Sequence, residues 1–557
     1  MAQRSWLGLA FILSGCFLSG EGVSPPKDRT VYFPVGLALD SGARHLFIVN
    51  SDFDLQYNAG TVESWDLDAL RARLPVACKS DADCDGGNVC DCADTVACGS
   101  QRTSGVPSNW CVAPGTPKPC PFSRELSASE RQLYPGRCFS INPLSTTGGT
   151  RAIHQASVEI GAFATDVIYR ARPASAAPDQ PGRLFVPVRG DATLHWIDVD
   201  DDGNLYCGQS DPGADGACAH THRRGDNPQA ENTRGLAMLP EPFGLDATES
   251  GEWLMVSNQS SFATGLFHNA WTAGGGYDNG PTYQYTIAGL SAQPIGVVAV
   301  PRSRASIAVK ELELPEFLVG FRGAAQIDLL RVYPDADSSP PRPYAKAPDA
   351  SPILTNSNGG DSRGMAIDVS VRTRAEAICA ARYGLSDDCA SGVSACEFPS
   401  GYVDCVQQAA AAPLDVLVTN RAPASLIVGE TRQVISEAVS YDVPTFVATF
   451  PLEFGAARVV TGEITNQQGE LERRAFSVSF DSRRIDIFDL ARGRVEAGVI
   501  TGRGPQAMVI DAEHALGYVA HFTDSYIGVV DLNQQHAQTY GVMIAMIETP
   551  AAPRASK

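Results

Sequence analysis

The chain has 557 residues, 44% of them hydrophobic, and carries a formal net charge of -20 at pH 7. This length is sufficient for several domains of ordinary size or for one large repeat domain. An acidic surface repels phosphate backbones, so the charge argues against binding of nucleic acid.

The N-terminus has the pattern of an export signal. A single arginine precedes an apolar run, Trp6 to Leu13, which is too short to span a bilayer but has the length of a signal-peptide core. The run ends in Leu-Ser-Gly-Cys, which resembles the lipobox of bacterial lipoproteins and implies that Cys16 becomes the lipidated first residue. We therefore expect a signal peptide over 1–15 and a lipid-anchored tether over 16–30, on an outer membrane or cell surface rather than an inner membrane. An ordinary cleaved signal is the alternative.

A three-strand pattern recurs along the rest of the chain. In its clearest copy, turn residues separate apolar runs over Gln506–Ile510, Leu516–His521 and Tyr526–Leu532. Runs this short are typical of strands in an antiparallel meander. Six further copies begin at Pro34, Ala164, Pro242, Pro294, Gly364 and Gly455. Because one meander cannot bury both of its faces alone, we expect the seven copies to pack in a ring.

The repeated unit resembles that of the YVTN-type seven-bladed β-propellers. It opens with Pro-x-Gly and an apolar run ending in Asp, continues with Leu-x-Val-x-Asn, and closes with an apolar run ending in Asp-Leu. The resemblance implies an all-β, seven-bladed propeller over 31–548 and a tail over 549–557. Residues Tyr540–Ile547 would be the last outer strand or would close the ring against Val31–Phe33. Two β-sandwich domains are the alternative, and a six-bladed ring would result if a weak unit such as that at Gly455 is not a blade.

The cysteines indicate an oxidising compartment. Apart from Cys16, they fall in even numbers into three segments that interrupt the repeats, about 68–156, 199–236 and 370–413. Even numbers are expected when disulfides are confined to separate inserts. The predicted disulfide cysteines are Cys78, Cys84, Cys90, Cys92, Cys98, Cys111, Cys120, Cys138, Cys207, Cys218, Cys379, Cys389, Cys396 and Cys405. Zinc is the alternative for the first group, although that group lacks paired Cys-x-x-Cys motifs and histidine.

Blade topology predicts where the inserts project. If the strands of a blade are labelled A to D from the axis outward, the A–B and C–D turns lie on one face of the ring. The first two inserts follow the third strand of their units, and the third insert separates a first strand from a second. All three are expected on one face, as a partner-recognition surface. Disulfides, at about 2–4 kcal/mol each, would hold these polar loops without a core of their own.

The opposite face is left to short B–C loops that are rich in amide, carboxylate and guanidinium groups. A ring of such groups at one mouth of a propeller predicts a ligand-binding funnel. The alternative is that these residues end strands because they tolerate turn conformations. The candidate funnel residues are Asn50, Asp52, Arg189, Asp191, Asn258, Arg322, Asn420, Arg421, Asp481, Arg483, His521 and Asp524.

Two acidic loops invite a calcium interpretation. Asp198, Asp200 and Asp202 alternate before Gly203, and Asp81, Asp83 and Asp85 alternate in the same way before Gly86. Carboxylates so spaced can converge on a hard cation. Gln209 and Cys92 stand where an EF-hand would have its glutamate, so a solvated turn is the alternative. The chain has no His-Glu-x-x-His, Gly-x-Ser-x-Gly or phosphate-binding Walker motif, and we predict no catalytic residue and no cofactor other than calcium.

Together these features predict a lipid-anchored, extracytoplasmic propeller that acts as a binding or scaffolding module at the cell envelope. Its partner would be a protein or a glycan, and the membrane would be reached only through the lipid. The alternative is a hydrolase or lactonase, metal-dependent or not, with its site at the central funnel. An enzyme needs a convergent acid/base or metal cluster at the axis, whereas a binding module can present a diverse ring.

Overall fold

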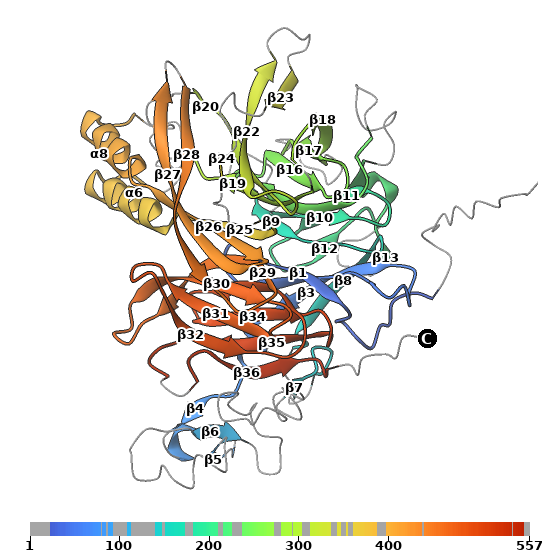
Figure 1. Ribbon diagram of the computed structural model, residues 1–557. Helices are drawn as coiled ribbons and strands as arrows, with labels where there is room; N and C mark the ends of the chain where they lie inside the picture. Colours follow the sequence, from blue (N-terminus) through green and yellow to red (C-terminus); the bar gives the residue numbers. More distant parts are fainter. Residues whose placement is uncertain are drawn as a thin grey trace, which may run out of the picture.

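The computed structural model consists of β-sheets arranged around a common centre (Figure 1). It describes residues 23–550, except 79–80, 85–86, 88, 93–108, 113–139, 147–150, 173–181, 210–215, 226–236, 272–279, 292, 303–311, 336–341, 347–352, 355–359, 387–396, 437–438 and 537–538. The predicted signal peptide and Cys16 lie outside the described residues. Of the helices that are described, none is long and apolar enough to cross a membrane.

Seven sheets, each with four antiparallel strands A to D, form the blades. Blades 1 to 3 contain β1 (Pro34–Leu39), β2 (His45–Asn50), β3 (Gly60–Asp66) and β8 (His154–Ile160); β9 (Ile168–Ala171), β10 (Gly182–Val188), β11 (Thr193–Val199) and a divided outer strand, β12 (Leu205–Tyr206) with β14 (Arg223–Arg224); and β15 (Pro242–Ala247), β16 (Trp253–Asn258), β17 (Ala263–His268) and β18 (Thr282–Ala288).

The last four blades complete the ring. They contain β19 (Pro294–Val300), β21 (Glu316–Phe321), β22 (Gln326–Asp335) and β23 (Arg342–Lys346), with β24 (Ile353–Leu354) also on β22; β25 (Ser362–Asp368), β26 (Leu414–Arg421), β27 (Ala424–Ser436) and β28 (Val439–Pro451); β29 (Ala456–Thr465), β30 (Leu471–Ser479), β31 (Arg484–Asp489) and β32 (Arg494–Ile500); and β33 (Pro505–Asp511), β34 (Leu516–His521), β35 (Tyr526–Asp531) and β36 (Val542–Ile547).

The predicted seven-bladed propeller is confirmed, because each of the seven sequence copies forms one blade. The described residues are mostly in β-strands, apart from short helices and the helical pair in one insert. Strand β36 pairs with β35, so it is the outer strand of blade 7 and does not close the ring against Val31–Phe33.

Apolar packing between blades forms the core. One cluster of buried side chains lies at each of the seven interfaces between neighbouring blades. Consecutive side chains of a strand point to opposite faces of its sheet. In β2, Phe47 packs toward blade 2 while Ile48 packs toward blade 7. Burial on both faces explains why the strands have continuous apolar sequences rather than alternating ones.

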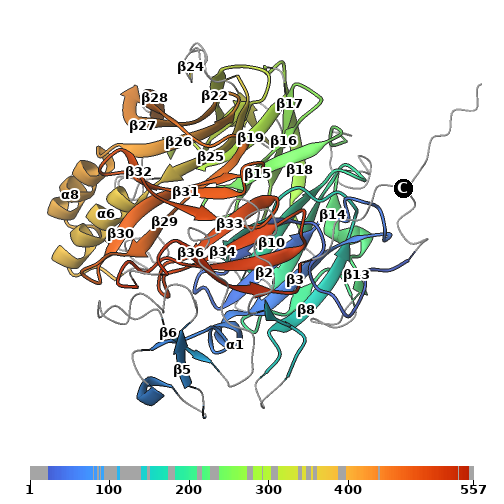
Figure 2. The same ribbon diagram turned by 60° about the horizontal axis from the view of Figure 1, so that its bottom comes forward.

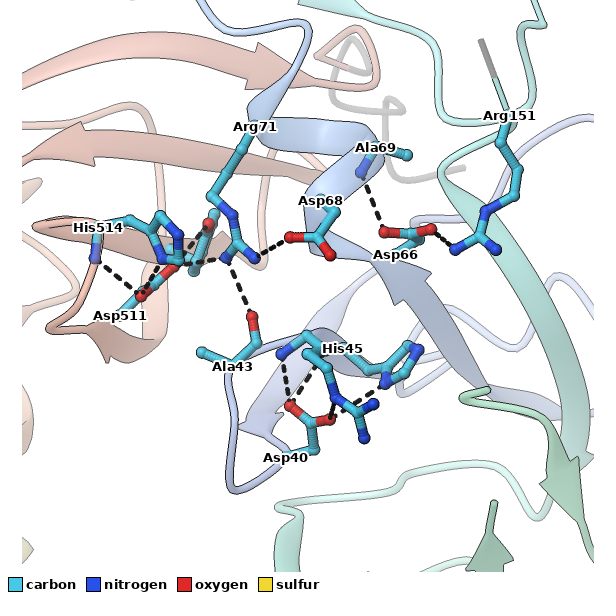
Figure 3. A network of polar contacts seen from close by, with 12 residues as sticks. Asp40, Ala43, His45, Asp66, Asp68, Ala69, Arg71, Arg151, Asp511 and His514 are labelled. Atoms are coloured by element: carbon cyan, nitrogen blue, oxygen red, sulfur yellow. Dashed lines mark hydrogen bonds and ion pairs between the residues drawn. The ribbon is translucent and has the colours of Figure 1, made fainter. Parts of the chain in front are cut away.

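No blade takes its four main strands from both ends of the chain. Blade 1 takes its four main strands from the N-terminal part of the chain, and blade 7 takes its four from the C-terminal part. Polar contacts support this junction on both faces. Helix α1 (Leu67–Arg71) places Arg71, whose Nη1 donates to the buried Asp511 carboxylate at 2.7 Å and to the Ala43 carbonyl at 3.0 Å (Figure 3). On the other face, the Thr30 N–H donates to Glu548 at 3.0 Å.

Short strands also connect neighbouring blades along their outer edges. Three of them add a parallel fifth strand to the blade beside their own: β7 (Ser140–Ile141) on β36, β13 (Gly216–Ala217) on β8, and β20 (Leu312–Glu313) on β28. An added strand covers hydrogen-bonding groups that an edge strand would otherwise expose. The chain segments between the blades thus reinforce the ring.

The first insert folds as a small separate sheet that stands away from the blades (Figures 1 and 2). It contains β4 (Ala77–Cys78), the 3-10 turn η1 (Asp81–Asp83), β5 (Val89–Cys92) and β6 (Asn109–Val112), in the order β4-β6-β5. Disulfides join Cys78 to Cys90 and Cys84 to Cys111. Because this insert connects β3 to β8, it is the C–D connection that the sequence predicted.

The second insert is not where the sequence placed it. Strands β11 and β12 form a close hairpin at Val199 and Leu205, and β14 returns to pair with β11 at Leu194. The intervening chain, which includes the 3-10 turn η4 (His220–His222), therefore interrupts the outer strand of blade 2. Its disulfide, Cys207–Cys218, lies at the outer rim beside blade 1, so the prediction of one common face was wrong for this insert.

The third insert is a helical hairpin in the A–B connection of blade 5, as predicted. Helices α6 (Ser370–Arg382) and α8 (Ser400–Ala410) lie side by side in both ribbon views and are joined by the disulfide Cys379–Cys405 (Figure 2). Contrary to the sequence-based prediction, this insert has an apolar core of its own, which includes Tyr402 and Val406.

The remaining predicted disulfide cysteines cannot be placed in the fold. Cys98, Cys120, Cys138, Cys389 and Cys396 lie outside the described residues, and the backbone alone is described at Cys92.

Candidate functional site

A cavity of about 290 Å³ lies at the axis, where the inner strands begin. All seven blades contribute to it, through their B–C loops or through the segments that enter their A strands. We call the side of the ring that carries these connections the funnel face, and it is the side on which the sequence predicted a funnel. The lining residues are Val35, Ser51, Phe53, Phe163, Ala164, Thr165, Arg189, Phe243, Ile295, Arg363, Arg421, Ala457, Phe480, Gln506 and Phe522.

Each blade supplies one lining residue from the same place in its repeat, the x of Pro-x-Gly or its equivalent. These residues are Val35, Thr165, Phe243, Ile295, Arg363, Ala457 and Gln506. In six blades the ladder between strands A and B shifts register at this position, as at a β-bulge. A bulged residue leaves the regular ladder, so its side chain can be redirected. The repeat thereby presents one variable side chain per blade to the cavity.

Phenylalanine side chains form an apolar wall at the mouth. The ring centroid of Phe53 lies 5.3 Å from that of Phe522 and 6.0 Å from that of Phe163, and the ring of Phe480 lies 6.2 Å from that of Phe522. Phe53 remains 54% exposed. Clustered aromatic rings give a ligand both apolar area and a surface for stacking.

The charged side chains of the lining are all arginines: Arg189, Arg363 and Arg421. Each is oriented by a carboxylate outside the lining. Nη2 of Arg189 donates to Glu241 at 2.9 Å, and Nη2 of Arg421 donates to Asp481 at 2.6 Å. A guanidinium has five N–H donors, so such a contact positions the group without using all of its donors.

Arg363 lies in a cluster of positive charge. Its Nε lies 2.8 Å from Asp361, which Arg322 also approaches at 3.7 Å. Burial lowers the pKa of Arg363, the charges of Arg322 and Arg421 lower it further, and Asp361 acts in the opposite direction. Arg322 and Arg363 share the Asp361 carboxylate, and Arg421 pairs with Asp481, so three guanidinium groups face two carboxylates and this side of the mouth is positively charged.

An ion pair crosses the axis beside the cavity. Nη2 of Arg458, in blade 6, donates to both carboxylate oxygens of Asp166, in blade 2. Each residue directly follows a lining residue, Ala457 and Thr165 respectively. Since blades 2 and 6 are not neighbours, the pair spans the central channel.

Asp52 is the candidate funnel residue whose pKa is raised most strongly. Its side chain is fully buried between the lining residues Ser51 and Phe53, and its Oδ1 accepts the Tyr57 N–H at 3.2 Å. Burial raises its pKa from 3.8 to about 7. A carboxyl group that titrates near neutrality therefore lies directly behind the cavity wall.

The three candidate asparagines have structural partners. The Asn50 amide donates to the Thr30 carbonyl at 2.9 Å and to Thr61 at 2.9 Å, which joins the entering chain to strand C. Asn258 donates to the Leu239 carbonyl at 2.6 Å, and Asn420 accepts from the Ser362 hydroxyl at 3.0 Å. All three are fully buried and absent from the cavity lining.

Other candidates lie behind the cavity wall. Asp191 accepts from the Thr193 hydroxyl at 2.6 Å, and Asp524 pairs with Arg503 at 2.5 Å. His521 is fully buried against Tyr526, and burial lowers its pKa to about 3. Arg483 occupies the B–C turn of blade 6 with a φ of 55°. Of the twelve candidates, Arg189 and Arg421 line the cavity.

The acidic loop of blade 2 has other partners for two of its carboxylates. Nε of the buried Arg183 donates to Asp198 at 2.6 Å, and Asp200 accepts the backbone N–H groups of Asp202 at 3.0 Å and Asn204 at 2.8 Å. Calcium at this loop stays an untested prediction.

Cysteine sulfurs form the one close group of metal-ligating atoms found among the described residues. These are Cys78, Cys84 and Cys111, and all three are in disulfides. A disulfide sulfur has no thiolate to offer zinc.

Sequence reasoning missed most of the lining. The phenylalanines of the rim and the x residues were not predicted, because a polar residue in a B–C loop is the pattern that indicates a ligand group. The sequence nevertheless contains an indication of these lining residues. The x position has the same place in every repeat, and its residue type varies, as in Val35, Arg363 and Gln506. Variation at a fixed position of a regular repeat indicates a surface that is free to specialise.

Comparison with known proteins extends to the fold alone. No family model matches the chain, and no curated protein matches it. Among solved structures, a candidate 6-phosphogluconolactonase from Bacteroides uniformis is 9% identical, with a TM-score of 0.40, and the match covers 84% of this chain and 86% of that one. A functionally unknown protein from Desulfotomaculum acetoxidans is 10% identical, with a TM-score of 0.39, over 74% of this chain and 95% of that one.

Hydrazine synthase from Kuenenia stuttgartiensis is a third match, 9% identical with a TM-score of 0.38, over 91% of this chain and 98% of that one. Likenesses this distant carry no argument about activity. The lining of the cavity is therefore the basis for a functional proposal.

Proposed function

We propose that this protein is an extracytoplasmic binding module whose central cavity takes a ligand with an anionic group and an apolar part. The lining carries the proposal, because phenylalanine and arginine are its recurring large side chains. Guanidinium groups pair with carboxylate, sulfonate or phosphate, and the aromatic wall would cover the apolar part. A terminal segment of an envelope protein or an acidic glycan would present such chemistry.

Export and lipid anchoring belong to the same proposal. Disulfides in all three inserts fit an oxidising, extracytoplasmic compartment. The first described residue, Val23, accepts the Asn58 N–H at 3.0 Å beside the B–C loop of blade 1, so the N-terminal segment reaches the funnel face. A tether from Cys16 to Val23 spans at most about 25 Å. A lipid on Cys16 would thus keep the funnel face close to the membrane.

Binding is favoured over the hydrolase or lactonase alternative by the chemistry of the lining. Its polar groups are hydroxyls, one amide and guanidinium groups, whereas hydrolysis would need a convergent acid and base. The axial carboxylate of Asp166 is engaged by Arg458.

The test is titration of the purified protein with anilinonaphthalene sulfonate, a fluorescent anion with an apolar body. We expect one saturable site that weakens with salt. The Arg363→Gln and Arg421→Gln variants should each raise the Kd of the probe about three- to tenfold, equivalent to roughly 1 kcal/mol. The matched control is Arg492→Gln, because Arg492 is 59% exposed on a C–D turn of the opposite face.

Binding that is unaffected by both cavity substitutions, or equally reduced by the control, would count against the proposal. Lipidation is checked separately by the mass of the N-terminal peptide and by loss of membrane association in Cys16→Ser.

A further inference from the structure

The ion pair at the axis occupies positions where the other blades have small residues. The residue after the lining position is Gly36, Gly244, Gly296, Gly364 and Ala507 in blades 1, 3, 4, 5 and 7. In blades 2 and 6 it is Asp166 and Arg458. The two charged exceptions among the seven positions are thus complementary, and they contact each other.

Neighbouring glycines allow the two charged residues to lie where they do. A Cβ on Gly364 would lie 2.7 Å from the Arg458 Cα, and a Cβ on Gly36 would lie 2.9 Å from Cγ1 of Val167, the residue after Asp166. Both approaches are closer than ordinary van der Waals contact. The repeat therefore brings the two backbones in tightly, and the charged side chains extend from them across the axis.

The geometry leaves Arg458 able to meet a ligand. Its side chain is 26% exposed and that of Asp166 is 13% exposed, beside the lining residues Ala457 and Thr165. Within the described part of the chain, the Arg458 guanidinium donates to Asp166 through Nη2. Asp166 is separately held by the Val167 N–H at 2.9 Å, so it keeps one hydrogen bond without Arg458.

We propose that Arg458 is the residue that selects for an anion at the inner end of the cavity, and that Asp166 is the intramolecular anion that the ligand displaces. This inference rests on the proposed function. A carboxylate, sulfonate or phosphate group takes the place of the Asp166 carboxylate on the guanidinium. Such an exchange keeps the arginine paired throughout, and the released Asp166 carboxylate keeps the hydrogen bond from the Val167 N–H. The loss of its ion pair is the cost that the ligand has to offset.

The experiment compares two probes of similar shape, the anionic anilinonaphthalene sulfonate and the uncharged N-phenylnaphthylamine. Arg458→Gln should weaken sulfonate binding about tenfold and leave amine binding unchanged, because the charge alone is lost. Asp166→Asn should strengthen sulfonate binding several-fold, because its competitor is gone, again without effect on the amine. The double variant, with both substitutions, checks through its thermal melt that a neutral pair preserves the fold.

Equal changes for both probes would overturn the inference, since they would show that the pair acts through packing. Wild-type affinity for the sulfonate in both single variants would overturn it as well, while the proposed function would survive. Absence of sulfonate binding in the wild-type protein would overturn the proposed function and this inference together.

Discussion

Single residues of the repeat motif act as structural caps more than as ligand groups. The Asp that ends strand A accepts backbone N–H groups in the following turn: Asp40 Oδ1 from Arg44 at 2.6 Å, and Asp511 Oδ1 from His514 at 3.2 Å. The Asn that ends strand B instead donates to a carbonyl of the entering chain, that of Thr30 for Asn50 and that of Leu239 for Asn258. The sequence predicted where these residues lie but not their role, because a buried amide and a ligand-binding amide have the same local pattern.

Asp52 predicts how stability depends on pH. Its folded-state pKa of about 7 lies above the unfolded-state value of 3.8, so the folded protein binds more protons between those values. Stability from this group is present at low pH and is lost as pH rises through about 7. Asp52→Asn should remove that dependence and make the protein roughly 1 to 3 kcal/mol more stable at pH 8 relative to the wild type.

The measurement is the free energy of unfolding in urea, followed across the pH range for the wild type and Asp52→Asn. The control is the Asp54→Asn variant, because Asp54 is an exposed neighbour. The same pH slope in wild type and Asp52→Asn would show that the group does not titrate as its burial implies.

At the scale of the strand, the bulge near the start of strand A both packs the blades and exposes a lining residue. The glycine after the bulge permits close approach to the next blade: a Cβ on Gly244 would lie 2.1 Å from the Ile295 carbonyl oxygen. Strand positions and apolar faces were predictable from periodicity, because burial on both faces leaves a continuous apolar run. The bulge itself was not, since it depends on pairing with a neighbouring strand.

Gly244→Ala should therefore cost about 2 to 4 kcal/mol, because backbone rather than a flexible side chain must move. Gly360→Ala is the control, since a Cβ there meets nothing within 4 Å. Denaturant midpoints of the two variants give the comparison, and similar midpoints would refute the packing argument.

Inserts were the least predictable elements. The cysteine spacing predicted that disulfides form within each insert, and the four described disulfides do so. It did not predict which cysteine pairs with which. The second insert was misplaced because β12 is two residues long and leaves almost no periodic signal. The helices of the third insert were not predicted, because its four cysteines indicated a polar loop held by disulfides.

For the whole molecule, closure between blades 1 and 7 depends on apolar packing, on the pairing of β7 with β36 and on a few polar contacts, rather than on a blade built from both ends of the chain. Arg71→Met should cost about 2 to 4 kcal/mol, because it leaves the buried Asp511 carboxylate with less compensation. The control is Arg374→Met, whose ion pair with Glu463 is exposed and should contribute about 0 to 1 kcal/mol. Equal losses in urea unfolding would contradict this view of the junction.

The N-terminal segment lies against that same junction, where Thr30 bonds to Glu548 and Arg29 Nη2 donates to the Ser525 carbonyl at 3.2 Å. If the chain is anchored through its N-terminus, any mechanical load on the tether enters the ring between its first and last blades. The contacts to blade 7 would transfer part of that load to the C-terminal strands. Pulling on the anchor would then strain the two ends of the chain together, instead of peeling blade 1 away from the ring.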